Sequence, residues 1–160
     1  MKKNKNIVIL SIFLILLLSS FKTLPKTKKL VINSGYKIPS RPGHKGVDYQ
    51  ASTGTKIMIK KTGQVLRTAT NCKVTSPRTT ACGGGWGNFV EIEYKPNVKV
   101  IYAHLSQVNV TPGEKVKAGK IIGLTGDTGN SRGAHLHFEY KVNNVNEDPT
   151  PHENKYFGLI

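Results

Sequence analysis

Past residue 21 the chain has no apolar period of 3.6 residues long enough to mark a helix, and its apolar residues alternate with polar ones instead. Alternation with period two is typical of strands, because successive side chains point to opposite faces of a sheet. The alternating runs are short, and turn residues such as Pro112-Gly113 separate them. The pattern predicts an all-β fold: one compact antiparallel β-sheet domain of many short strands.

The expected strands can be placed by residue number: 56–60, 64–69, 88–94, 99–105, 120–124 and 135 to about 142. The strand 88–94 alternates most clearly, and we expect it to be half-buried. Residues 31–42 contain Gly35, Pro39 and Pro42 and are expected to form an irregular lead-in. The segment from Asp148 onward is expected to be a loose end, with His152 on the surface.

The run Gly-Ala-His-Leu-His-Phe-Glu follows a glycine-punctuated loop and carries His135 and His137. On a strand, both imidazoles would project from one face, whereas Leu136 and Phe138 would point the opposite way into a core. The alternative is two surface histidines on a solvated strand. The strand is therefore expected to have one buried face and one face that carries chemistry.

A second motif, Gly43 to Asp48, sets an imidazole and a carboxylate four residues apart. Pro42, Gly43 and Gly46 favour a loop that enters a strand over a helix. His44 and Asp48 together suit Zn²⁺, which takes imidazole nitrogen and carboxylate oxygen as ligands. The alternative is that Asp48 accepts a hydrogen bond from a structural histidine.

His104 ends another short β-rich run, and a single histidine at a strand end is usually a partly buried, hydrogen-bonded residue. Four of the five histidines nevertheless lie in three short segments. If these strands are neighbours, the chain holds a three-ligand metal site and two further imidazoles, the arrangement of a catalytic zinc with one open position. Spacing alone does not say which of His135 and His137 binds the metal.

The three motifs, in this order and at these separations, closely resemble those of the M23 family of zinc peptidases, the lysostaphin and LytM type. The residues that carry the resemblance are His44-x-x-x-Asp48, Tyr102-Ala103-His104-Leu105 and His135-Leu136-His137, with Gly87-Asn88 and the glycines from Gly113 to Gly129 in support. The resemblance covers about residues 43–149. It implies a compact antiparallel β fold with an active-site groove on the sheet.

The resemblance also implies a function: a zinc-dependent endopeptidase that hydrolyses peptide bonds of bacterial peptidoglycan. By position, His44, Asp48 and His137 would bind one Zn²⁺ per chain, and His135 would be the general base on a zinc-bound water. His104 would orient that water or, as an imidazolium, stabilise the developing oxyanion.

The N-terminus has the layout of a secretory signal peptide: three early lysines, an apolar run from Ile7 to Leu18, then two serines. The run is shorter than the roughly 20 residues of a spanning helix, although an uncleaved anchor remains the alternative. We expect a signal peptide or anchor at 1–21, a linker and lead-in at 22–42, a peptidase domain at 43–149 and a tail at 150–160. The protein is expected to be exported to the periplasm, cell envelope or exterior as a monomer, with membrane association only through the N-terminal segment and without an inhibitory pro-region.

Cys72 and Cys82 are the only cysteines, and in an exported chain they predict a disulfide that closes an inserted loop. Metal ligation and free thiols are the alternatives, although no CxxC pair supports a structural zinc site. The formal charge is +15, or +12 without the three early lysines, which favours polyanionic partners. No nucleic-acid-binding motif is present, so an anionic cell envelope fits better, beside the alternative of a generally basic surface.

Two other functions remain open from the sequence. A non-catalytic cell-wall-binding or amidase-activator domain could use the same scaffold, but such domains lose zinc or catalytic residues and this chain keeps all five. The turn around Val116 to Gly123 is similar to turns in lipoyl-type carrier domains, which have no use for paired histidines.

Overall fold

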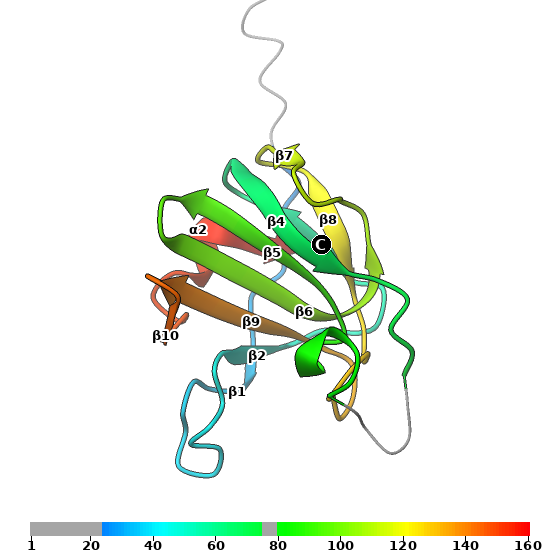
Figure 1. Ribbon diagram of the computed structural model, residues 1–160, viewed down its shortest axis with the longest axis vertical. Coiled ribbons are helices and arrows are strands. Elements are labelled where there is room, and N and C mark those ends of the chain that lie inside the picture. The colour runs from blue at the N-terminus through cyan, green and yellow to red at the C-terminus, as the bar shows by residue number, and fades with distance from the viewer. Residues whose placement is uncertain (1–23, 75–79) are drawn as a thin grey trace, which may run out of the picture.

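The structure is a computed structural model that describes residues 24–74 and 80–160 (Figure 1). The expected signal or anchor segment at 1–21 lies outside the described residues, and no described helix is long and apolar enough to cross a membrane. The described elements are β1 (Ile32–Ser34), β2 (Val47–Gln50), β3 (Lys56–Ile59), β4 (Gly63–Ala69), the 3₁₀ turn η1 (Gly83–Gly85), β5 (Asn88–Lys95), β6 (Val98–Val108), β7 (Lys115–Val116), β8 (Ile121–Thr125), β9 (His135–Val142), β10 (Val145–Glu147), α2 (Glu153–Tyr156) and β11 (Phe157–Leu159).

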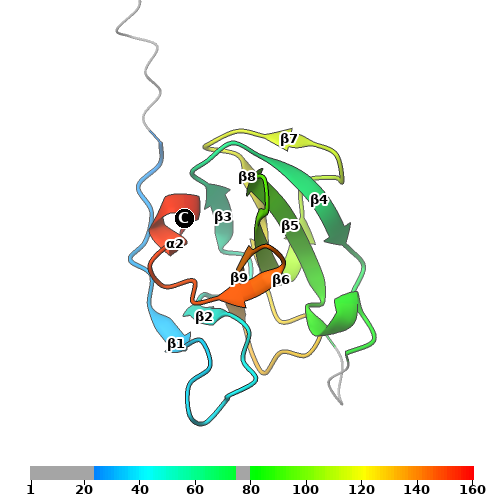
Figure 2. The same ribbon diagram turned by 60° about the vertical axis from the view of Figure 1, so that its left-hand side comes forward.

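All paired strands are antiparallel, so the predicted all-β fold is confirmed. The main sheet runs in the order β1-β2-β9-β6-β5-β4-β7. The long strand β6 pairs with β9 over its first part and with β8 from Leu105 onward. Because β8 then pairs with β3, and β3 with β11, the sheet curls over on itself around the core (Figure 2).

One face of the main sheet lines the apolar core, and the other carries the polar site. Tyr49, Tyr102 and Phe138 are fully buried in the core, where they meet the residues of β3 and β11. The predicted inward orientation of Leu136 and Phe138 is confirmed, since both are 0% exposed. The alternation therefore separates packing from chemistry within single strands.

The strand at 88–94 is covered on both faces, and its expected half-burial is wrong. Val90 and Ile92 enter the main core, whereas Phe89 packs in a second, smaller cluster that includes Ile101 and Trp86. Glu91 is also buried, because its carboxylate accepts a hydrogen bond from Arg67. The charged residue Glu91 in the alternating pattern therefore indicated a side chain that is buried with a hydrogen-bond partner, and not a face of the strand exposed to solvent.

The loose end expected after residue 148 is also wrong. Residues 153–156 form α2, and β11 pairs with β3 through Phe157 and Leu159, which are buried. His152 is only partly exposed, because its ring stacks on Tyr140 at 4.3 Å between centroids. The segment was missed because its apolar residues are few, although they close the core.

The lead-in at 31–42 is less irregular than expected, since Ile32–Ser34 forms β1 and pairs with β2. Before it, the backbone N–H of Lys28 donates to the carbonyl of Leu159. The described part of the expected linker therefore packs along the C-terminal strand.

Candidate active site

Strand register places two of the predicted ligands side by side. Asp48 on β2 lies directly opposite His137 on β9, and His137 lies opposite Ala103 on β6. All three side chains point to the face of the sheet away from the main core. Asp48 and His137 are buried, with 6% and 7% of their surface exposed.

His44 reaches the same point from the loop before β2. Its Nδ1–H donates to the carbonyl of Gly35 at 2.7 Å, which turns Nε2 toward Asp48 Oδ1 at 3.0 Å and His137 Nδ1 at 3.2 Å. Gly46 allows this approach: a β-carbon there would lie 2.9 Å from Cε1 of His137 and closer still to the carbonyl of Phe138. The glycine in the motif is therefore required by close packing against β9.

The other ring nitrogen of His137 is also occupied, since Nε2–H donates to Glu139 Oε1 at 3.2 Å. A carbonyl and a carboxylate can only accept, so His44 and His137 carry their protons on the outer nitrogens. With a single proton on each ring, His44 Nε2, His137 Nδ1 and Asp48 Oδ1 face one another with lone pairs, and the last two atoms are 2.7 Å apart. Three converging acceptors need a positive charge between them.

The electrostatics of the cluster agree with that requirement. Burial raises the pKa of Asp48, but the surrounding imidazoles of His135, His137 and His44 lower it more, so Asp48 is a carboxylate. Burial lowers the pKa of His137, yet the carboxylates of Asp48 and Glu139 raise it above its ordinary value. A proton or a metal cation can supply the positive charge that stabilises these three side chains beside one another.

His44, Asp48 and His137 fit a metal ion. Their three ligand atoms lie within 4.8 Å of one another. Around a tetrahedral zinc with ligands at 2.0–2.2 Å, neighbouring ligand atoms are about 3.3 to 3.6 Å apart, slightly more than the distances seen between these three. Two imidazoles and one carboxylate are borderline ligands, and three protein ligands would leave the fourth position of a tetrahedral metal ion open.

His135 and His104 flank this cluster. His135 Nδ1–H donates to the carbonyl of Gly133 at 2.8 Å, so its Nε2 carries a lone pair and lies 3.5 Å from Asp48 Oδ1. His104 Nδ1–H donates to the carbonyl of Thr128 at 2.8 Å, so its Nε2 is likewise an acceptor. The two rings are 4.8 Å apart between centroids. All five predicted residues thus meet at one place on the sheet.

The backbone of His104 adopts φ = 61°, a left-handed conformation that side chains other than glycine seldom take. His104 stands where β6 leaves β9 and joins β8, and its N–H donates to the carbonyl of Trp86. Burial, with His135 and His137 nearby, lowers the pKa of His104 to about 4. The resting ring is therefore neutral, which favours the predicted role in orienting water over that of an imidazolium.

Several residues at the site were not singled out from the sequence. Arg41 Nη1 donates to Asp48 Oδ2 at 2.6 Å, Glu139 accepts from His137, and Trp86 donates to Glu139. Arg41 stands three residues before His44 and Glu139 two after His137, so proximity to the motifs was the only available signal. The hydrogen bonds that Arg41 and Glu139 make at the site do not follow from the spacing of the motifs.

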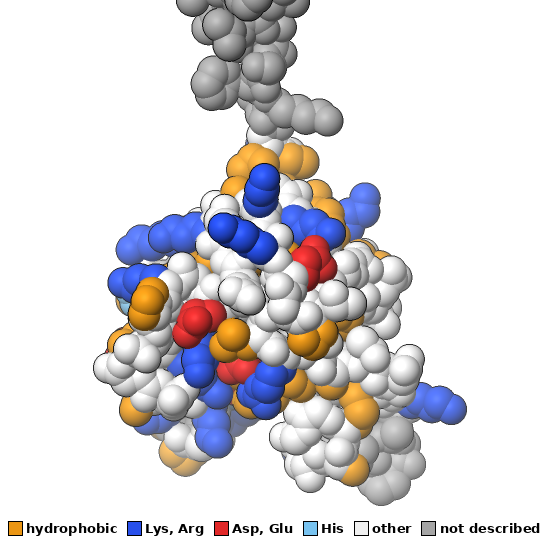
Figure 3. Space-filling view, turned by 45° about the horizontal axis from the view of Figure 1, so that its top comes forward, with side chains coloured by type: hydrophobic (Ala, Val, Ile, Leu, Met, Phe, Trp, Pro, Cys, Tyr) orange, Lys and Arg blue, Asp and Glu red, His pale blue; other side chains and the backbone are white. Residues whose placement is uncertain are grey.

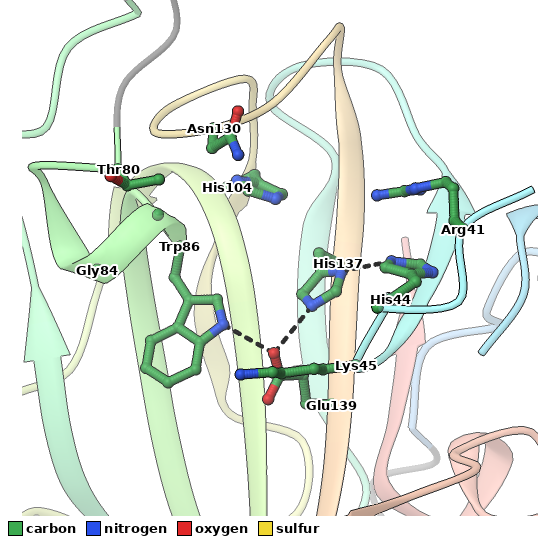
Figure 4. Close-up of a pocket in the computed structure, with 12 residues that line it drawn as sticks. Arg41, His44, Lys45, Thr80, Gly84, Trp86, His104, Asn130, His137 and Glu139 are labelled. Carbon is green, nitrogen blue, oxygen red and sulfur yellow. Dashed lines mark hydrogen bonds and ion pairs between the residues drawn. The ribbon is translucent and has the colours of Figure 1, made fainter. Parts of the chain in front are cut away.

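Two adjoining hollows, each of about 410 Å³, open over the cluster and share Arg41, His104 and Asn130. Figure 4 shows the first hollow, with His137 between Arg41 and His104 on one side and Trp86 and Glu139 on the other. Thr80 and Gly84 form part of its wall. The groove therefore runs over the ligand cluster.

The insert that supplies this wall is closed by the predicted disulfide, because Cys72 and Cys82 are bonded to each other. Both cysteines are used in that bond, which excludes free thiols and metal ligation. The side-chain amide of Asn88 accepts from the N–H of Cys72 and donates to the carbonyl of Leu105, so the insert is tied to β5 and β6. On the face shown in Figure 3, lysine and arginine side chains lie at many separate places and acidic side chains at few.

Comparisons with known proteins agree on one family. The sequence pattern of peptidase family M23 matches residues 42–149. The chain is similar to the glycyl-glycine endopeptidase ALE-1 of Staphylococcus capitis, with 36% identity over 68% of this chain and 28% of that protein. It is also similar to the peptidoglycan DD-endopeptidase ShyC of Vibrio cholerae, with 35% identity over 66% of this chain and 22% of that protein.

Among solved structures, the chain is similar to a mutant catalytic domain of the prophage-encoded M23 protein EnpA from Enterococcus faecalis. The TM-score is 0.62 and the identity 31%, and the match covers 80% of this chain and 95% of that domain. The chain spans about a quarter of the length of the two curated relatives.

Proposed function

The chain belongs to peptidase family M23, and from that premise we propose that it is a zinc-dependent endopeptidase that hydrolyses peptide bonds of bacterial peptidoglycan. The observation that carries the proposal is the convergence of three lone pairs, from His44, Asp48 and His137, in a groove that two further imidazoles flank. The chain keeps all five residues that the family resemblance assigns to metal binding and catalysis.

His44, Asp48 and His137 would hold the Zn²⁺. When bound, zinc polarises a carbonyl and lowers the pKa of a coordinated water to about 7. Arg41 holds Oδ2 of Asp48 and so leaves Oδ1 directed at the cluster. The carbonyl of Gly35 and the carboxylate of Glu139 direct His44 and His137 in the same way.

His135 is the proposed general base. Its Nδ1–H is fixed on the carbonyl of Gly133, and Nε2 faces the cluster, 3.5 Å from Asp48 Oδ1. As water attacks the peptide carbonyl, Nε2 takes the proton, and the same atom returns it to the leaving amine. Hydrolysis therefore consumes one water and leaves His135 unchanged.

His104 is proposed to orient the attacking water. Its Nε2 is an acceptor, and the carbonyl of Thr128 and the backbone contact with Trp86 fix the ring. The left-handed backbone conformation at His104 is strained, and holding the residue in it costs of order 1–3 kcal/mol. Such strain is typical of positions that function requires.

The proposed substrate is peptidoglycan, because relatives such as ShyC are named for that activity. The chain is proposed to act as a monomer after export to the periplasm, envelope or exterior. The basic surface favours attraction to an anionic envelope.

The test combines metal content with product release from purified peptidoglycan. Wild-type protein is expected to hold one Zn²⁺ and to release soluble fragments that mass spectrometry identifies. His135→Ala is expected to keep zinc and to lose at least a hundredfold in rate, because only the base is removed. His137→Ala is expected to lose the metal and the activity together.

Two results would contradict the proposal. A His135→Ala protein that digests peptidoglycan at the wild-type rate would remove the assignment of the base. A wild-type protein that binds peptidoglycan and releases no fragments would favour a non-catalytic binding or activator domain instead.

A further inference from the structure

Glu139 is a buried carboxylate that the proposed reaction does not itself use. It is only 2% exposed and lies on β9, two residues after His137 and on the same face of the sheet. Burying a carboxylate is costly unless hydrogen bonds replace its water, so its contacts should show why it is there.

Both oxygens of Glu139 are fully engaged. Oε1 accepts from the indole Nε1–H of Trp86 at 2.8 Å and from Nε2–H of His137 at 3.2 Å. Oε2 accepts from the amide of Asn146 at 2.8 Å and lies 3.4 Å from Nζ of Lys141. Four donors from three parts of the chain thus fix the carboxylate in one orientation.

That orientation favours one tautomer of His137. Because Oε1 can only accept, its contact holds a proton on Nε2 of His137, which leaves Nδ1, the nitrogen that faces Asp48 and His44, to a metal ion. Without an acceptor at this position, the proton could move to Nδ1 and block the ligand atom. Carboxylates that hold metal-binding histidines in this manner also raise the basicity of the ligand.

Trp86 links the same carboxylate to a second site residue. While its indole donates to Glu139, its backbone carbonyl accepts from the N–H of His104. Trp86 is the only tryptophan of the chain and directly follows the turn η1, which the disulfide at Cys82 precedes. Trp86, a residue of the groove wall, therefore contacts both Glu139, which bonds to His137, and His104.

We propose that Glu139 is a positioning residue that holds His137 in its metal-binding tautomer, and that Trp86 and Asn146 hold Glu139 in place. The inference rests on the proposed function, because it requires that His137 binds zinc. Glu139 is not one of the three residues whose ligand atoms converge.

The test measures zinc affinity of the full-length protein, stripped of metal and titrated with Zn²⁺ against a chromophoric chelator. Replacing Glu139 by leucine removes the acceptor and is expected to weaken zinc binding 10- to 100-fold. Glu139→Gln keeps one acceptor oxygen of the same shape and is expected to fall between wild type and Glu139→Leu. Trp86→Phe keeps the ring but removes one donor, so a smaller loss of a few-fold is expected.

Glu91→Gln is the matched control. Glu91 is also a buried glutamate on the same face, but it lies two strands away on β5 and accepts from Arg67. The Glu91→Gln substitution is expected to leave zinc affinity within twofold of wild type. The Nε2–H signal of His137 in proton NMR of the zinc-loaded protein is expected to exchange slowly in wild type and rapidly in Glu139→Leu.

The outcomes separate this inference from the proposed function. If wild type binds zinc and folded Glu139→Gln and Glu139→Leu bind it equally well, with the Nε2–H signal unchanged, the positioning role is overturned and the enzyme proposal stands. If wild type binds no zinc, the proposed function is overturned and the inference falls with it. If Glu139→Leu does not fold, the comparison of Glu139→Gln with Glu91→Gln decides the matter.

Discussion

At the scale of single residues, Gly46 shows how closely the ligand loop packs on β9. A β-carbon at this position would meet His137 and the backbone of Phe138, and the backbone cannot move without shifting the strand. We therefore expect Gly46→Ala to destabilise the fold by about 1–3 kcal/mol, as overpacking does, and to weaken zinc binding. Urea unfolding and the zinc titration measure the two effects.

Gly43 provides the control for this prediction, since it lies in the same loop and a β-carbon there would meet nothing within 4 Å. Gly43→Ala is expected to change stability by less than about 0.5 kcal/mol. Equal effects at the two glycines would show that loop flexibility, and not contact with His137, is what Gly46 provides.

The residue scale also shows what the sequence could and could not predict about the site. Strand alternation alone placed His135 and His137 on one face, because that geometry depends only on the period of the strand. The protonated nitrogen of His44 and of His104 depends instead on acceptors in other segments, the carbonyls of Gly35 and Thr128. No local spacing contains that information.

At the scale of elements, the C-terminal strand β11 contributes more than its three residues suggest. Phe157 is fully buried, and its ring lies 4.7 Å from Phe138, 5.6 Å from Tyr49 and 5.8 Å from Tyr102, between centroids. Phe157→Ala is expected to cost about 3–5 kcal/mol, because it leaves a cavity among these aromatic rings. Denaturant unfolding measures the loss.

Val145→Ala is the control at this scale, since Val145 lies on β10 and is 64% exposed. We expect a change within about 0.5 kcal/mol. If Phe157→Ala lowers the free energy of unfolding by less than 1 kcal/mol, the C-terminal segment contributes little to the core, as expected of the loose end that the sequence indicated.

The interior strands were predictable from the sequence and the terminal elements were not. The expected strand at 135–142 matches β9, and the runs at 56–60 and 64–69 match β3 and β4 to within a residue at each end, because each has several alternating residues between clear turns. β1 and β11 have three residues each, which is too few for a period to be visible. Their positions depend on contacts with strands remote in sequence.

At the scale of the whole molecule, a group of tyrosines joins the main sheet to the C-terminal helix. The hydroxyls of Tyr94 and Tyr102 are 2.8 Å apart, and the ring of Tyr156 lies 4.7 Å from that of Tyr94 and 5.8 Å from that of Tyr140. The alternating pattern placed Tyr94 on the side of β5 that faces the core. It did not indicate that α2 would cover that side, since the curl of the sheet brings the two together.

These tyrosines make the stability of the fold sensitive to alkaline pH. Burial raises the pKa of Tyr156 to about 12, and burial raises that of Tyr102 well above its ordinary value. In the unfolded chain a tyrosine loses its proton near pH 10, so above that pH the unfolded state binds fewer protons than the folded one. The stabilisation that these tyrosines provide is therefore complete below pH 10. The free energy of unfolding is expected to fall as pH rises from 10 to 12.

Tyr156→Phe separates this effect from the titration of lysines on the surface. The variant keeps the ring contacts with Tyr94 and Tyr140 but has no hydroxyl to ionise, so its free energy of unfolding is expected to fall less steeply between pH 10 and 12. Urea unfolding curves for both proteins at half-unit intervals from pH 8 to 12 give the two slopes. Parallel slopes would show that Tyr156 ionises in the folded protein as readily as in the unfolded chain.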